Sequence, residues 1–120
     1  MVTAKQIAEL AATYIERGFV KGEWSVDASG RYVESFSSEA VAWCVDGAVE
    51  CALHNLGYNT SSSDPSCRAL FNQVESKLAS AMKAKVGNPD NMDEVTLIFS
   101  VNDHPNTTKE DILYYLSQVS

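Results

Sequence analysis

The sequence predicts a mainly α-helical (α+β) fold, in which about four helices pack around a central apolar helix beside a small β-hairpin. Apolar residues recur at helical spacing in four segments, and capping residues flank those segments. Between 19 and 36 the pattern changes, because turn residues there separate two short apolar runs. With 120 residues and no linker-like segment, the chain is expected to form one globular domain over 1–120.

The first helix is predicted over 3–17. Thr3 and Gln6 have the capping-box spacing, in which each side chain accepts a hydrogen bond from a backbone N–H that the helix leaves without a partner. Apolar residues then recur on one face, and Gly18 is a typical position for the helix to end.

A short hairpin is predicted next. The turn sequence 27–30 ends in Gly30, which adopts the positive φ that tight connections often need, and it separates the runs that contain Trp24 and Tyr32. Two strands alone are only marginally stable. We therefore expect the hairpin to pack on a helix through Trp24 or Tyr32.

The central helix is predicted over 39–56, from a cap at Ser37 or Ser38 to a stop at Gly57. Its apolar residues cover most of its circumference, which is typical of a helix surrounded by protein. Gly47 lowers its helix propensity by about 1 kcal/mol relative to alanine. A close approach of another backbone at Gly47 would compensate for that cost.

Two further helices are predicted in the second half of the chain. Asp64 is a typical N-cap before a helix over 65–86, and Thr107 with Glu110 has capping-box spacing before a final helix. The apolar run 95–101 is too short for its periodicity to distinguish a third strand from a turn of helix, so both alternatives stay open.

The formal charge of −7, from 16 acidic and 9 basic residues, argues against some classes of function. Phosphate contacts require clustered Lys and Arg, whereas the basic residues here are scattered, so we predict no direct binding of nucleic acid. No apolar run approaches the roughly 18 residues of a membrane span, and no membrane partner is expected. The acidic surface keeps the protein soluble, and it would also suit a basic partner or mimic a polyanion.

The cysteines indicate a reducing compartment. Cys44 and Cys51 are seven residues apart, so on one helix they would lie about 10 Å apart along the axis, too far for a disulfide. With Cys67 the count is odd, and we expect all three thiols to be free. Because no secretion leader is recognisable at the N-terminus, a cytoplasmic location is predicted.

Several short motifs resemble those of a bacterial and phage family of unknown function. They are, in chain order, Trp24 with the turn 27–30, Trp43-Cys44, Gly47-Ala48, and Asn102-Asp103 before a capped helix. Val101 stands where members of the family have a tryptophan. The resemblance implies the same helical fold without an established activity, and it implies a phage-encoded protein that acts on a host protein.

Cys44 is the candidate nucleophile of a cysteine-dependent enzyme. At the start of the central helix, the helix dipole would lower the pKa of its thiol. His104 or His54 would act as the base, with Asn102 or Asp103 orienting it, as in cysteine hydrolases and transferases. The alternative is a small buried hydrophobic residue, because free cysteines are among the most buried residue types.

Asp46, Glu50 and His54 are spaced by four residues, so they are predicted to share one face of the central helix. A carboxylate and a histidine one turn apart can both reach a metal ion. Nothing in the sequence nominates the remaining ligands. We therefore predict no metal and no cofactor, and we interpret this face as the solvated edge of the helix.

Asn102 and Asp103 are the candidate ligand-binding pair, because they are expected in a turn after an apolar run. Trp24 and Trp43 are the candidate aromatic residues beside them. The alternative is a capping role, since Asn and Asp side chains readily bond nearby backbone N–H groups.

These observations favour a non-enzymatic binding protein with a protein partner. Two alternatives stay open: a hydrolase or transferase that uses Cys44, and a protein that sequesters a small, nucleotide-like ligand. Reactivity of Cys44 would favour the enzyme, and stabilisation by a metabolite would favour the sequestering protein.

Overall fold

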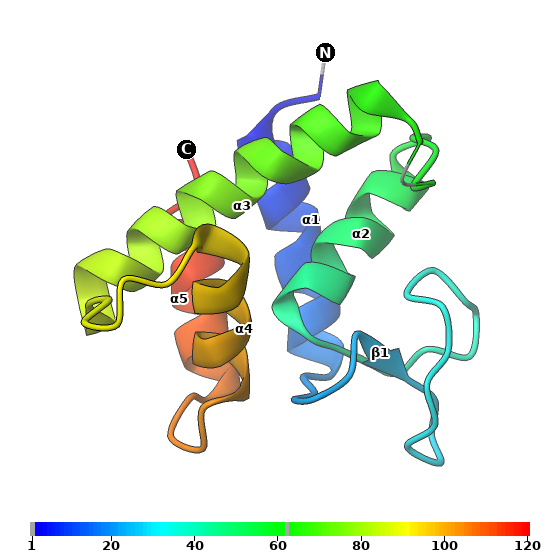
Figure 1. Ribbon diagram of the computed structural model, residues 1–120. Helices are drawn as coiled ribbons and strands as arrows, with labels where there is room; N and C mark the ends of the chain where they lie inside the picture. Colours follow the sequence, from blue (N-terminus) through cyan, green and yellow to red (C-terminus); the bar gives the residue numbers. More distant parts are fainter. Residues whose placement is uncertain (1, 62) are drawn as a thin grey trace.

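The structure, a computed structural model, describes residues 2–61 and 63–120 (Figure 1). The described residues form helices and one two-stranded antiparallel sheet, which confirms the mainly α-helical class with a small β element. In chain order the elements are α1 (Ala4–Arg17), β1 (Ser25–Val26), β2 (Ala42–Trp43), α2 (Val45–Asn55), α3 (Pro65–Val86), α4 (Glu94–Asp103) and α5 (Lys109–Ser117).

The helices share one hydrophobic core. Helix α1 packs against α2 on one side and α5 on the other, and α3, the longest helix, lies across the remaining four (Figure 1). All five helices of the described residues contribute buried apolar side chains to the same cluster. No helix in the described part of the chain is both long and apolar enough to cross a membrane.

Side-chain caps set the ends of the helices, largely where the sequence predicts them. Thr3 and Gln6 form the expected capping box, with Thr3 N donating to Gln6 Oε1 at 2.8 Å. Asp64 accepts hydrogen bonds from the first turn of α3, as predicted. The last capping box is one residue later than predicted: it joins Thr108 and Asp111 rather than Thr107 and Glu110.

The start of the central helix was predicted six residues too early. Instead of a helix from 39, the structure has β2 at Ala42–Trp43, and α2 begins only at Val45. Backbone bonds to a distant segment explain the difference: Val41 N donates to Val26 O and Cys44 N donates to Trp24 O, both at 2.9 Å. Apolar periodicity cannot reveal such pairing, because the partners lie far apart in sequence.

The predicted hairpin is present only in part. Asp27 organises the expected turn, since its carboxylate accepts hydrogen bonds from the backbone N–H of Ser29 and of Arg31. After this turn, Tyr32 makes one isolated bridge with Val26. The ladder partner of β1 is instead β2, sixteen positions along the chain, with Val26 opposite Ala42.

The run 95–101 belongs to a helix. Asp93 caps α4 by accepting a hydrogen bond from Thr96 N at 2.8 Å, and the helix continues through Asp103. Asn102 and Asp103 therefore end a helix, and the prediction that they lie in a turn is wrong. The turn begins only at His104, the C-cap residue.

Gly47 lies where two backbones cross. A Cβ atom at this position would overlap the carbonyl oxygen of Trp24, which passes directly over the first turn of α2. The same carbonyl accepts the hydrogen bond from Cys44 N. The close backbone approach expected from the sequence is thus present, and its partner is the segment that leads into β1.

Gly47→Ala tests this crossing. We expect the substitution to lower the free energy of unfolding by more than about 2 kcal/mol, because a backbone oxygen cannot rotate away from the new methyl group. Chemical denaturation measures the change. In a helix without such a crossing, alanine would raise stability by about 1 kcal/mol, and that result would contradict the close approach.

Candidate functional site

Cys44 does not have the environment of a nucleophile. It is the N-cap of α2, it is buried, and its Sγ accepts a hydrogen bond from Gly47 N at 3.3 Å. Burial raises the pKa of the thiol to about 12, despite the hydrogen bond from the helix. The prediction that the helix dipole lowers this pKa is wrong, because desolvation outweighs the dipole. All three cysteines are buried and free.

The two histidines are exposed and make contacts with other residues. His104 is exposed at the end of α4, where its Nδ1 accepts a hydrogen bond from Asn106 N at 3.1 Å. His54 is exposed near the end of α2, and its ring stacks on Phe36 with 4.0 Å between centroids. Among the described residues, no hydrogen bond links Cys44 to a histidine. The structure therefore does not assemble the Cys–His arrangement considered from the sequence.

Asn102 joins the end of α4 to the beginning of α2. Its buried Oδ1 accepts a hydrogen bond from Val45 N at 2.9 Å, and its amide donates to Val20 O at 3.4 Å. The adjacent Asp103 is exposed, and its Oδ1 accepts from Gly22 N at 3.0 Å and from the Asn102 amide at 2.9 Å. These contacts give both residues a capping role between segments.

Trp43 and Trp24 have different environments. Trp43 is buried in the core, where its indole N–H donates to Ser35 O at 2.7 Å. Trp24 is half-buried and packs between Phe71 and Phe99, with ring centroids 6.4 and 6.3 Å away. Of the four residues proposed from the sequence as a ligand site, Trp24 alone presents an aromatic ring to a surface pocket.

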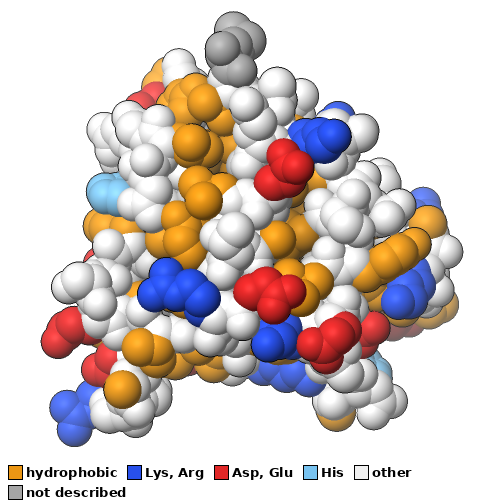
Figure 2. Space-filling view, turned by 180° about the vertical axis from the view of Figure 1, so that it is seen from behind, with side chains coloured by type: hydrophobic (Ala, Val, Ile, Leu, Met, Phe, Trp, Pro, Cys, Tyr) orange, Lys and Arg blue, Asp and Glu red, His pale blue; other side chains and the backbone are white. Residues whose placement is uncertain are grey.

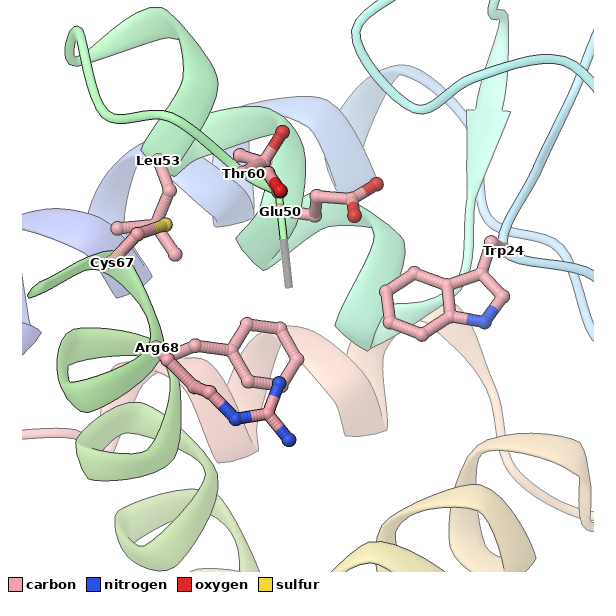
Figure 3. Close-up of a pocket in the computed structure, with 8 residues that line it drawn as sticks. Trp24, Glu50, Leu53, Thr60, Cys67 and Arg68 are labelled. Carbon is pink, nitrogen blue, oxygen red and sulfur yellow. The ribbon is translucent and has the colours of Figure 1, made fainter. Parts of the chain in front are cut away.

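The pocket beside Trp24 lies between α2 and α3 (Figure 3). Its volume is about 170 Å³, and we call it the Trp24 pocket. Its lining residues are Trp24, Glu50, Leu53, Thr60, Ser61, Cys67, Arg68 and Phe71. Trp24 also lines a second hollow, together with Cys44, Phe99 and Asp103.

Asp46 and Glu75 form a buried acidic pair that the sequence analysis missed. Asp46 is 1% exposed and Glu75 is 3% exposed, so the prediction that Asp46 lies on a solvated helix edge is wrong. Within the described chain, no donor group reaches Asp46 Oδ1 or either carboxyl oxygen of Glu75. Two carboxylates can only accept hydrogen bonds, so a proton is needed to join them.

Glu75 carries that proton. Its pKa is raised to about 10, first by burial and then by the hydrogen bond and the negative charge of Asp46. Burial also raises the pKa of Asp46, while the hydrogen bond from Glu75 opposes that rise. Protonated Glu75 thus donates to Asp46. One sequence signal pointed to Glu75, since it shares a helix face with the apolar residues Phe71 and Leu78.

Asp46, Glu50 and His54 were expected on one face of the central helix, but each has a different environment. Asp46 is buried against Glu75, Glu50 reaches the Trp24 pocket, and His54 is exposed against Phe36. In the chain as described, no three His, Cys, Asp or Glu side chains are placed to hold a metal ion.

Asn102→Ala and Asp103→Ala separate the two capping roles. The first variant leaves the buried Val45 N–H without a partner, and we expect it to lower the free energy of unfolding by about 1–3 kcal/mol. The second removes the hydrogen bonds from Gly22 N and from the Asn102 amide, but Asp103 is exposed and leaves no buried group without a partner, so the loss should stay below about 1 kcal/mol. Urea denaturation of both variants measures the difference. Equal losses of stability in the two variants would show that Asn102 is not the principal link between α4 and the start of α2.

Glu75→Gln tests the shared proton through its pH dependence. Since the pKa of Glu75 is raised in the folded state, its stabilisation is complete below about pH 4 and is lost as the pH rises toward about 10. Wild-type stability should therefore fall as the pH rises between these two values, because the folded state holds a proton that the unfolded state releases. Glutamine keeps a neutral donor to Asp46, so the variant should be more stable near neutrality with a flatter profile. Thermal unfolding from acidic to alkaline pH tests this.

The exposed Glu9→Gln variant is the matched control, and its pH profile should follow that of the wild type. An unchanged profile in Glu75→Gln would contradict a shared proton.

Comparison with known proteins places the chain in a family. Residues 1–119 match the model of a family described as Family of unknown function (DUF6197). No curated protein and no solved structure gives a significant match. Because the family match spans nearly the entire sequence, the chain belongs to the family of unknown function DUF6197.

Proposed function

We propose that the protein is a non-enzymatic binding protein that recognises a protein partner through the loop 27–41, between β1 and β2. The observation that carries this proposal is the exposure of large apolar side chains on one short segment. Tyr32 is 55% exposed, Phe36 is 36% exposed and Val41 is 44% exposed. Exposed apolar groups gathered on one loop are typical of interaction sites.

The loop 27–41 is ordered by polar contacts that reach the core. Ser35 is buried, its carbonyl accepts the hydrogen bond from the Trp43 indole, and its hydroxyl donates to Glu50 Oε1 at 2.6 Å. Val33 is held in a similar way, since its carbonyl accepts from the Ser25 hydroxyl at 2.6 Å. A loop fixed before binding loses less conformational entropy when a partner docks.

The surroundings of the loop indicate the character of the partner. Phe36 stacks on His54 of α2, so an aromatic ring of the helix adjoins the loop. Glu34 and Glu39 are exposed on the loop with a single basic residue, Arg31. A partner with basic residues around an apolar centre would complement this surface.

Charge distribution elsewhere supports a protein partner rather than nucleic acid. On the face shown in Figure 2, acidic and basic side chains are interspersed, and no continuous basic patch is seen in that view. This proposal includes a phage origin and a host-protein target, which the resemblance implies. It also includes a cytoplasmic location, which the free thiols favour. The protonated, buried Cys44 weighs against the cysteine enzyme.

Paired variants test the proposed surface. We expect Tyr32→Ser with Phe36→Ser to lose a partner that the wild-type protein captures from host cytoplasm, because the apolar centre of the interface is gone. Val95→Ser with Tyr114→Ser is the control, since these side chains are also exposed but lie away from the loop, Val95 on α4 and Tyr114 on α5. Quantitative mass spectrometry of the captured proteins compares the variants, after circular dichroism has shown that both fold.

The proposal requires a partner that the control retains and the loop variant loses. Capture of the same partner by all variants would exclude the loop 27–41 as the binding surface.

A further inference from the structure

We propose that the Trp24 pocket binds a free α-amino acid with an apolar side chain. This inference goes beyond the proposed protein-binding surface and does not depend on it. It stands on three features of the pocket: an apolar wall, two opposite charges that do not pair with each other, and a small volume.

The apolar wall would hold the side chain of the amino acid. Trp24 and Phe71 stack with 6.4 Å between their centroids, so the pocket has an aromatic side that is already in place. Leu53 and Cys67 are buried at the base, on the far side of the hollow from Trp24 (Figure 3). Burying an aliphatic or aromatic side chain against this wall would remove apolar surface from water and so favour binding.

Two side chains of opposite charge line the same pocket and come from different helices. Glu50 reaches it from α2 and Arg68 from α3 (Figure 3). In the part of the chain that the structure describes, the one ion pair joins Lys85 and Asp111, so Glu50 and Arg68 do not neutralise each other. Glu50 is positioned by Ser35, whose hydroxyl donates to Oε1, and this leaves Oε2 available to a ligand.

A zwitterion satisfies both charges at once. Its carboxylate would accept hydrogen bonds from the Arg68 guanidinium, which is suited to carboxylates because it presents paired N–H donors. Its ammonium group would donate to Glu50 Oε2. A ligand that carries only one charge would bind only one of these two protein groups and would lose the charge-assisted hydrogen bond to the other.

The volume limits the ligand to about one amino acid. The pocket measures about 170 Å³, close to the engineered protein cavity of about 150 Å³ that binds benzene. Sites for larger organic ligands occupy about 300–1,000 Å³. The volume therefore suits one amino acid better than the nucleotide-like ligand considered from the sequence.

The test uses the full chain and amino acids of defined charge. L-leucine and L-phenylalanine should raise the melting temperature and give measurable affinity by calorimetry, whereas glycine should not. Leucinamide lacks the carboxylate and N-acetyl-leucine lacks the ammonium group, and each should bind at least about tenfold more weakly than leucine.

Two variants assign each ligand charge to its protein group. In Arg68→Gln, leucine and leucinamide should bind equally weakly, because the carboxylate no longer has its partner. Glu50→Gln should bind leucine and N-acetyl-leucine with equal affinity, because the ammonium group no longer has its partner. The glutamine oxygen can still accept the hydrogen bond from Ser35. Lys83→Gln and Glu9→Gln are exposed controls that should bind leucine like the wild type.

The proposal is overturned if neither leucine nor phenylalanine binds at millimolar concentration. It is also overturned if leucinamide or N-acetyl-leucine binds as tightly as leucine to the wild type, since the pocket would then recognise only one charge. These measurements include no protein partner, so their failure leaves the test of the loop 27–41 unaffected.

Discussion

The structure depends on the crossing of the segment at Trp24 over the first turn of α2. The Trp24 carbonyl lies so close to Gly47 that a side chain there would collide with it, and it accepts a hydrogen bond from Cys44 N. This contact fixes where α2 begins, and it brings β1 beside β2. The Trp24 ring then packs between Phe71 of α3 and Phe99 of α4.

The contacts of Asn102 secure the same junction from another side. Its side chain accepts from Val45 N, the first residue of α2, and donates to the carbonyl of Val20 before β1. The short motifs around Cys44, Gly47 and Asn102 thus meet at one place in the fold. Their proximity has a mechanical explanation, because each satisfies a backbone group or allows one to approach. Catalysis is not needed to account for their arrangement.

The polar groups outside this junction divide into buried and accessible sets. Asp46 and Glu75 are enclosed between α2 and α3, where a shared proton makes their burial tolerable and couples stability to pH. Glu50, one helical turn after Asp46, is instead oriented by Ser35 toward the Trp24 pocket. The same Ser35 holds the loop 27–41. The pocket and the proposed docking loop are therefore mechanically linked through one buried serine.

The sequence by itself determined the helical class, the capped helices α1 and α3, and the close approach at Gly47, because caps and glycine act within a few residues of the chain. It did not determine the start of α2, the partner of β1 or the helical state of 95–101. Nor could it place Asn102 beside Val45 or Glu75 beside Asp46, or show that Cys44 is buried. Those features arise from hydrogen bonds and desolvation between segments distant in sequence, and only the packed tertiary structure brings such segments together.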